Sequence, residues 1–211
     1  MPHKGQLYSI DERYITASFF FLLMEILTQT ELQLRGAEIA NRIKKGAVFI
    51  HPTDTIYGLS CDASNKDAVK RIREIKNRPD SPFSVWVPSI KWIENNCVIN
   101  KEGEKWLKEL PGPYTLITKL KNKNAISKEV IPKTDNLGVR LPNHWLGEFI
   151  RLLNIPFVST SANKAGQPFM TSLRDLDPEV ETRVDFAIYE GEKKSRPSKI
   201  VHLVEDNVKE R

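Results

Sequence analysis

Short apolar, β-branched runs alternate with amphipathic helical segments along most of this 211-residue chain. The segment "LRGAEIANRIKKG" has apolar residues at helical spacing and two lysines in its last turn, and Gly46 ends it. A β-branched run at 47–50 follows directly and indicates a buried strand. Strands and helices keep alternating, and no internal repeat or low-complexity linker interrupts them. The sequence therefore predicts a single α/β domain, a twisted mixed β-sheet flanked by helices.

The elements expected after residue 50 keep this alternation. Residues 51–62, "HPTDTIYGLSCD", are expected to be a polar loop where chemistry would sit. Asn65 is the expected N-cap of a helix that the prolines at 79 and 82 end. Further strands are predicted at 83–87, 114–120, 137–141, 156–160, 186–189 and 199–203, and helices at 102–110 and 146–153.

The most apolar stretch, Ala17 to Leu27, does not predict a membrane span. It is shorter than the ~20 residues that cross a bilayer, and Glu25 interrupts it. No small-residue cleavage site follows it, so we expect a buried helix or strand rather than a signal peptide. Two cysteines, Cys61 and Cys97, are too few for a disulfide framework. These features predict a cytoplasmic protein without a membrane partner.

The chain carries 32 Lys and Arg against 27 Asp and Glu, a net charge of +5, which suits a nucleic-acid footprint, an anionic-ligand pocket or simply solubility. Residues 66–78 hold six basic residues against two acidic ones. Residues 101–133 hold eight lysines against four glutamates and no arginine. Since lysine is a strongly hydrated point charge, the second stretch is interpreted as solvated surface, with a weak patch facing a nucleic acid as the alternative.

Four polar segments follow or end predicted strands and helices, at 52–59, 76–79, 138–142 and 159–163. Ligands of open α/β sheets bind outside the strand ends, so these segments are expected to converge. Taken singly, each has a simpler explanation: Lys76 and Arg78 suit the end of a helix dipole, and "STSAN" suits a cap or turn. No phosphate-binding loop of the GxxxxGK[ST] or GxGxxG type is present.

Arg140 stands out because it lies within an apolar strand, where an unpaired guanidinium is costly. It requires a carboxylate, from a ligand or from a residue such as Asp54 or Asp62. Thr53, Thr55 and Tyr57 suggest either a hydroxyl-lined pocket or a capped turn. No Ser-His-Asp or Cys-His arrangement is indicated, so the residues favour positioning and charge stabilisation of an anionic reactant over covalent catalysis.

Six motifs in this order resemble the YrdC/Sua family, the threonylcarbamoyl-adenylate synthases of tRNA modification. They are "PTDTIYGLSCDA", "AVKRIREIKNRPDSP", "LPGPYTLI", "LGVRLPNH", "STSANKAGQP" and "PSKIVHL". The resemblance runs from about Ala37 to Arg211. It implies a YrdC/RibB-like fold over residues 36–211, with residues 1–35 as an N-terminal extension packed on that domain.

The resemblance also implies a reaction: L-threonine, bicarbonate and ATP, with Mg²⁺, give threonylcarbamoyl-AMP and pyrophosphate. Lys76 and Arg78 would be the catalytic residues. The implied ATP-binding residues are Lys76, Arg78, Ser81, Asn136, Ser161, Asn163 and Arg211. The implied threonine-binding residues are Thr53, Thr55, Tyr57, Arg140, Ser159 and Ser198. Metal ligands are not assigned, and tRNA or tRNA-modification proteins are the implied partners.

The chain also departs from the family pattern. Trp86 stands where the family usually has His, and Ser81 where Asn is usual; Ala165, Lys199 and His202 replace the usual Ser, Thr and Asp. Trp86 cannot accept a proton, which bears on the threonine pocket. These departures support an alternative: a YciO-like homologue that binds RNA without efficient synthase activity.

Overall fold

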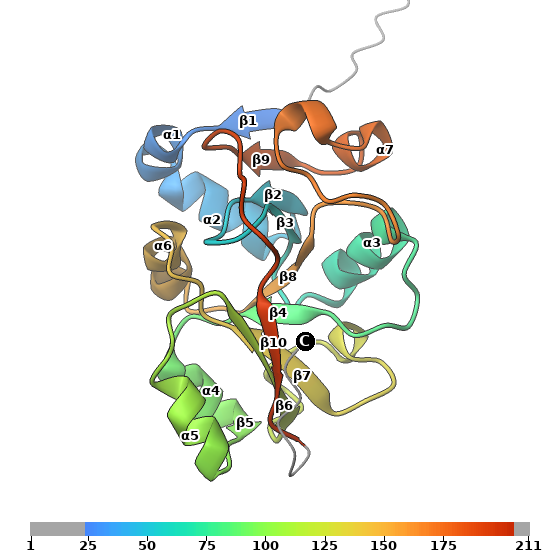
Figure 1. The fold of residues 1–211 in the computed structure, drawn as a ribbon. Coiled ribbons are helices and arrows are strands. Elements are labelled where there is room, and N and C mark those ends of the chain that lie inside the picture. Colours follow the sequence, from blue (N-terminus) through green and yellow to red (C-terminus); the bar gives the residue numbers. More distant parts are fainter. Residues whose placement is uncertain (1–23, 205–211) are drawn as a thin grey trace, which may run out of the picture.

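The computed structural model describes residues 24–204 and builds them around one mixed sheet (Figure 1). Its strands are β1 (Glu25–Leu27), β2 (Phe49–His51), β3 (Gly58–Ser60), β4 (Ser84–Trp86), β5 (Cys97–Val98), β6 (Tyr114–Leu120), β7 (Asn136–Arg140), β8 (Phe157–Ser161), β9 (Phe186–Ile188) and β10 (Lys199–His202). Their order is β1-β9-β2-β3-β8-β4-β7-β6-β10, with β5 paired to β6. Four pairings are parallel, namely β1 with β9, β9 with β2, β4 with β7 and β6 with β10. The predicted α/β fold with a mixed sheet is confirmed.

Helices cover both faces of this sheet. They are α1 (Gln29–Leu34), α2 (Gly36–Lys44), α3 (Lys66–Lys76), α4 (Ile90–Asn96), α5 (Lys101–Leu107), α6 (Leu146–Leu153) and α7 (Pro178–Glu181), with 3-10 turns at Lys128–Val130 and Leu173–Asp175. Asn65 caps α3 as predicted, because its side chain accepts hydrogen bonds from the backbone N–H groups of Asp67 and Ala68. Asn77, in the left-handed conformation, ends the helix.

The period-two alternation of the strands divides the core into two clusters. Phe49, Trp86 and Phe157 face one side, where they pack with apolar residues of α1, α2 and α6. Their strand neighbours Ile50 and Val85 face the other side and pack with residues of α3, α4 and α5. Both faces of the central strands are therefore buried over much of their length.

Several elements differ from the sequence-based expectation. The predicted loop after β2 contains the buried strand β3, which pairs with both β2 and β8. Helices α1, α4 and α7 and the short strand β5 were not predicted from the sequence. Within the apolar run 17–27, residues 25–27 form β1 and pair with β9, while residues 17–23 lie outside the described part. The domain boundary at residue 35 stays a prediction.

One connection crosses the whole sheet. The crossing segment, residues 189–198, leaves β9 near one edge and enters β10 at the opposite edge (Figure 1). The Tyr57 hydroxyl donates a hydrogen bond to the Gly191 carbonyl at 2.6 Å and ties the segment to the loop before β3. No helix within residues 24–204 is long and apolar enough to cross a membrane.

Candidate active site

A cavity of about 620 Å³ lies on the sheet face that carries Ser84 and Gly138. Ser84 and Trp86 are two residues apart on β4 and therefore point to the same face of the sheet. Trp86, however, is fully buried in the cluster beneath α1, α2 and α6. The cavity is thus the part of the face that these helices leave uncovered. Seven of the predicted site residues line it: Tyr57, Arg78, Asn136, Arg140, Ser159, Ser161 and Ser198.

Arg140 is positioned at one end of the cavity by a network behind it. Its Nη2 lies 3.1 Å from the Thr55 Oγ1 and 3.3 Å from the Asp54 Oδ1. The Thr55 hydroxyl lies 2.9 Å from that of Thr53, and Asp54 also accepts from the Asn143 backbone N–H at 3.0 Å. Asp54 is therefore the carboxylate partner of Arg140, which the sequence left undecided between a ligand and a residue such as Asp54 or Asp62. The two threonines orient Arg140 without lining the cavity. Burial lowers the pKa of the Arg140 guanidinium, and Asp54 counteracts this effect.

Lys76 does not reach the cavity, contrary to its expected contact with ATP. It is 2% exposed, and its Nζ donates to the carbonyl oxygens of Ser161 and Asn163, each at 2.7 Å, and to the Asn163 Oδ1 at 2.9 Å. The three N–H groups of an ammonium are thereby matched by three oxygens. Lys76 holds the loop after β8, and Asn163 takes part in that clamp rather than in the cavity wall.

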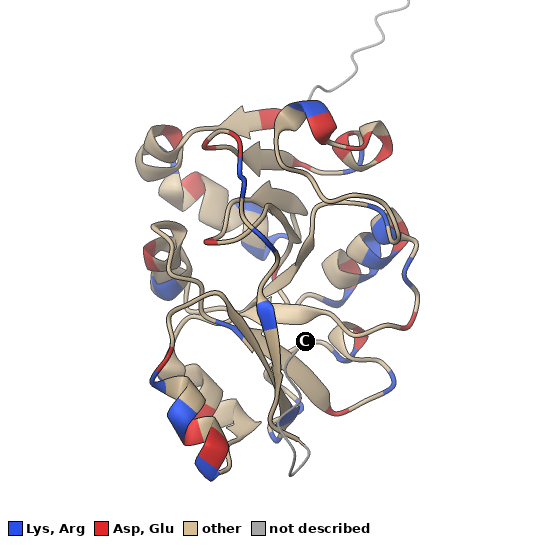
Figure 2. Ribbon diagram, in the orientation of Figure 1, with Lys and Arg blue, Asp and Glu red and all other residues tan. Residues whose placement is uncertain are grey.

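Arg78 is the basic group at the cavity's other end, because it contacts Pro82 just before β4, whereas Arg140 is the register neighbour of Trp86 at the end of β4. The Arg78 Nη2 donates to the Pro82 carbonyl at 2.9 Å, and the Arg78 guanidinium lies over the Phe83 ring at 5.4 Å. Burial lowers the pKa of the Arg78 guanidinium. Lys133 also lines the cavity, but it pairs with Asp80 at 2.6 Å. The positive charge of Arg78 therefore remains in the lining, whereas Arg140 has Asp54 behind it as a partner. Figure 2 shows further basic residues along the crossing segment and α3.

Hydroxyl groups line the cavity between these two arginines. Ser198, on the crossing segment, lies 2.7 Å from the Thr115 Oγ1 on β6. Thr115 was not predicted as a site residue, although the "PGPYT" motif contains it. Lys133 and His202 also line the cavity; His202 had been noted only as a departure from the family motif, and Lys133 only as part of a stretch interpreted as solvated surface. Ser81 lies outside the lining, and Arg211 lies outside the described residues.

The described residues offer no protein cage for a metal. No group of three or more His, Cys, Asp or Glu side chains among them could hold an ion. The cavity's own carboxylate, Asp80, is already paired with Lys133. A magnesium ion at this site would therefore depend on oxygen ligands from a substrate.

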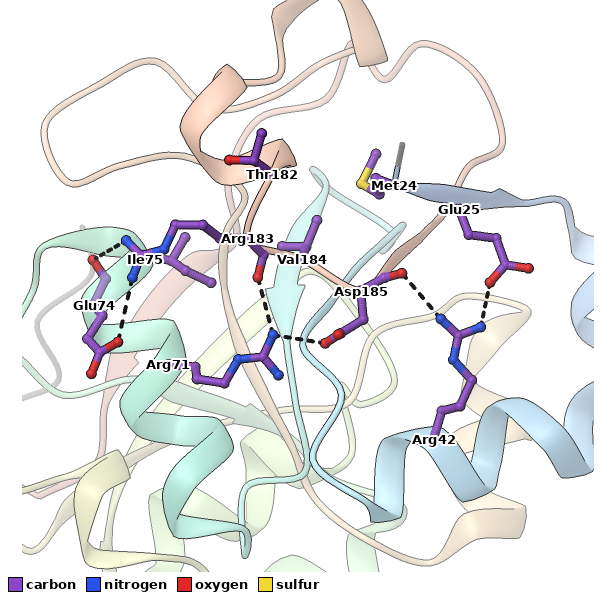
Figure 3. A pocket seen from close by; sticks show the side chains of 10 residues that line it. All are labelled: Met24, Glu25, Arg42, Arg71, Glu74, Ile75, Thr182, Arg183, Val184 and Asp185. Carbon is purple, nitrogen blue, oxygen red and sulfur yellow. Dashed lines mark hydrogen bonds and ion pairs between the residues drawn. The ribbon is translucent and has the colours of Figure 1, made fainter. Parts of the chain in front are cut away.

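A second hollow, of about 490 Å³, lies between α2, α3 and the strands β1 and β9 (Figure 3). It contains three arginines, but each one is paired. Arg42 contacts Glu25, Arg71 lies 3.1 Å from Asp185, and Arg183 lies 3.5 Å from Glu74. Its charges are thus neutralised internally, and these ion pairs connect β1 and β9 to the neighbouring helices.

Comparison with known proteins gives the site its context. The Sua5/YciO/YrdC family model, described as "Telomere recombination", matches residues 41–210. A Methanocaldococcus jannaschii protein named "Putative threonylcarbamoyl-AMP synthase" is 36% identical over 174 residues, 81% of this chain and 81% of its own length. The threonylcarbamoyl-AMP synthase of Bacillus subtilis is 32% identical over 173 residues, which are 80% of this chain and 49% of that protein. The chain thus spans about half the length of the Bacillus relative.

Solved structures agree with these matches. Pyrococcus abyssi Sua5 in complex with L-threonine superposes with a TM-score of 0.79 at 27% identity, covering 88% of this chain and 55% of that one. Escherichia coli YciO, with a TM-score of 0.74 at 24% identity, shares the fold over 92% of its length. The expected resemblance is confirmed: the chain belongs to the Sua5/YciO/YrdC family.

Proposed function

We propose that the protein is a threonylcarbamoyl-AMP synthase, which converts L-threonine, bicarbonate and ATP into threonylcarbamoyl-AMP and pyrophosphate. One observation carries the proposal. A single cavity has a buried arginine at one end and a second arginine at the other, with hydroxyl groups between them. Two anionic reactants can thus be held facing each other. The names of the relatives and the threonine complex of P. abyssi Sua5 support the same activity.

The Arg140 end suits the amino acid. Arg140 is only 7% exposed, and its positive charge is countered by Asp54 at 3.3 Å rather than by a close bidentate pair. A substrate carboxylate entering here would complete the pairing and recover part of the burial cost of the guanidinium. Tyr57, Ser159 and Ser198 would contact the rest of the molecule, while Thr53 and Thr55 keep Arg140 in place.

The Arg78 end suits the phosphates of ATP. Arg78 would contact the phosphates of ATP as the adenylyl group is transferred, with Ser161 and Asn136 as hydrogen-bonding neighbours in the lining. Mg²⁺ would enter bound to the phosphate oxygens, because the described residues supply no cage for it. Lys76 contributes indirectly, by holding the loop that presents Ser161.

The chemistry requires two anions to meet. The threonine amine combines with bicarbonate, losing water, to give a carbamate. A carbamate oxygen then attacks the α-phosphorus, and the bond to the pyrophosphate breaks. Two unit charges 4 Å apart repel by roughly 4 kcal/mol at an effective dielectric constant of 20. Arg140 and Arg78 would offset this repulsion, so the enzyme would act mainly by positioning and charge stabilisation.

A crossed pair of variants tests these roles. Pyrophosphate release is measured with ATP and bicarbonate while threonine is varied, and then with ATP varied. Arg140→Ala should raise the KM for threonine at least tenfold with a smaller change for ATP, and Arg78→Ala should do the reverse. Arg151→Ala is the matched control, since Arg151 is exposed on α6 and pairs with Glu148.

Two results would count against the proposal. One is the absence of threonine-dependent pyrophosphate release by the wild-type protein together with tight, steeply salt-dependent RNA binding, which would favour the YciO-like alternative. The other is an equal rise of the KM for threonine and the KM for ATP in each variant. That result would contradict the assignment of Arg140 to threonine and Arg78 to ATP.

The proposal extends to the product's destination. Threonylcarbamoyl-AMP would pass to tRNA, directly or through tRNA-modification proteins. A cytoplasmic setting belongs to the same proposal, and the two cysteines, which are buried free thiols, are consistent with it.

A further inference from the structure

The start of the crossing segment holds Tyr57, a residue of the cavity lining. The Tyr57 ring stacks on that of Tyr189, with the two centroids 5.5 Å apart. Its hydroxyl donates to the Gly191 carbonyl at 2.6 Å and accepts from the Glu190 backbone N–H at 3.1 Å. The Lys193 Nζ lies 5.8 Å from the ring centroid. Four residues of the crossing segment therefore contact this one side chain.

The carboxylate of Glu190 anchors the same stretch of the segment. It accepts hydrogen bonds from the Trp145 Nε1 at 2.6 Å and the His144 Nε2 at 3.1 Å, and it pairs with the Lys193 Nζ at 2.5 Å. The His144 Nδ1 accepts from the Leu146 backbone N–H at 3.3 Å, so Nε2 carries the proton and donates to the carboxylate. Three donors thus converge on one carboxylate.

The charges of this cluster favour an ionised glutamate. Burial raises the pKa of the Glu190 carboxyl, but the hydrogen bonds from Lys193 and from the other two donors outweigh it, so the pKa lies below its ordinary value. Burial lowers the pKa of His144, although Glu190 counteracts this effect, which favours the neutral imidazole. The charge of Glu190 is therefore matched by that of Lys193.

The two donors from outside the crossing segment belong to residues 141–145, the loop that follows Arg140. Asp54 ties this loop to Arg140, because it accepts a backbone hydrogen bond from the loop at 3.0 Å and lies 3.3 Å from the Arg140 Nη2. Asp54 and Tyr57 in turn share the connection between β2 and β3. Glu190 therefore joins the crossing segment to the chain segments around Arg140.

We propose that Glu190 is a positioning residue, which holds Tyr57 at the threonine end of the cavity by anchoring the crossing segment to the loop after β7. The inference rests on the proposed function and deepens it, because Glu190 lies outside the cavity lining and would act on threonine binding through Tyr57. The far end of the crossing segment is fixed separately, where β10 pairs with β6. Loss of the anchor should therefore disturb the Tyr57 end and spare the ATP end.

The experiment measures threonine binding by calorimetry without ATP, and the KM values for threonine and ATP from pyrophosphate release. Glu190→Gln keeps the size of the side chain but offers a single acceptor oxygen and no charge to the three donors. Glu190→Asp keeps the charge. Glu192→Gln is the matched control, since Glu192 lies on the same segment and is exposed, 3.8 Å from the Lys194 Nζ. Circular dichroism and the melting temperature establish that each variant is folded.

Glu190→Gln should weaken threonine binding at least tenfold and raise the KM for threonine by a similar factor, with less than a twofold change in the KM for ATP. Glu190→Asp should bind threonine more tightly than Glu190→Gln, and Glu192→Gln should match the wild type. Unchanged threonine affinity in folded Glu190→Gln would overturn the inference. An equal rise of both KM values would overturn it too, since Glu190 would then support the whole domain rather than one end of the cavity.

A double-mutant cycle shows whether Glu190 acts through Tyr57. Tyr57→Phe removes the hydroxyl that bonds to the crossing segment. The loss of threonine affinity caused by Glu190→Gln should be at least threefold smaller in the Tyr57→Phe background than in the wild type. Fully additive losses would contradict the positioning role, because the two residues would then contribute independently.

The binding measurement separates this inference from the proposed function. A wild-type protein that binds threonine, loses affinity on Glu190→Gln and releases no pyrophosphate would contradict the synthase and support the positioning role. An active wild-type protein whose KM for threonine is unchanged by Glu190→Gln would support the synthase and overturn the positioning role. A wild-type protein that neither binds threonine nor releases pyrophosphate would overturn both.

Discussion

Replacing His51 by phenylalanine is expected to make the protein more resistant to mild acid. His51 is fully buried, between Phe49 and Trp86, and burial lowers its pKa from 6.5 to about 3. In the unfolded chain the imidazole takes up its proton as the pH falls through 6.5, whereas the folded protein resists protonation until about pH 3. The unfolded state therefore binds more protons in this window, so the free energy of unfolding falls as the pH falls.

The size of the effect follows from the shift. Each pKa unit corresponds to about 1.4 kcal/mol, so a shift from 6.5 to about 3 amounts to roughly 5 kcal/mol over the whole window. Between pH 7.5 and pH 4.5 the contribution is about 2.5 kcal/mol. Phenylalanine keeps a ring of similar size beside Phe49 and Trp86 but cannot bind a proton.

Urea unfolding at several pH values measures this contribution. The difference in unfolding free energy between His51→Phe and the wild type should shift by about 2.5 kcal/mol in favour of the variant on going from pH 7.5 to pH 4.5. Taking the difference cancels the titration of the carboxylates, which both proteins share. The same pH dependence in both proteins would refute the reasoning, since it would mean that His51 is protonated or accessible in the folded state.

Three further predictions concern the scaffold of the site. Lys76→Met, which leaves three loop oxygens without their donor, should lower the unfolding free energy in urea by about 3 kcal/mol, whereas Lys70→Met, at an exposed position of the same helix, should change it by less than about 0.5 kcal/mol; equal effects would argue against the clamp. Gly138→Ala places a Cβ 2.5 Å from the Ser84 Oγ on the cavity floor, so threonine binding measured by calorimetry should weaken, and unchanged affinity would show that the floor tolerates the methyl group. Asn65→Ala removes the cap of α3 and should cost about 1 kcal/mol in thermal unfolding, with no loss meaning that the cap is dispensable.

Local patterns predicted most of the fold. The helices α2, α3 and α6 lie where apolar spacing and capping residues indicated them, and β4, β6 and β7 coincide with β-branched runs. Strand β3 was missed because three residues, "GLS", are too short to show a period-two pattern, and its two flanking strands define it instead. Helix α4 was missed because it has only seven residues, too few to show a clear helical period.

The candidate site was predicted only in part. Its polar segments were recognised, and Arg140 was expected to face a carboxylate, as it does with Asp54. Lys76 was expected to contact ATP because the resemblance of "KNRP" to the family motif implied it. Helix α3 ends at Lys76, and Asn77 in the left-handed conformation turns the chain before Arg78, so Lys76 points inward to the loop after β8 while Arg78 lines the cavity.

The sequence alone determined the alternation of elements, the family and the polar segments at the strand ends, because these depend on short-range periodicity and on ordered motifs. Only the tertiary structure decided which of those polar groups share the cavity. The strand order is not sequential, so β2, β4 and β7 bring His51, Trp86 and Arg140 together from positions up to 89 residues apart. Burial then removes water from their side chains, so packing and pairing across the sheet, rather than local sequence, set their environment.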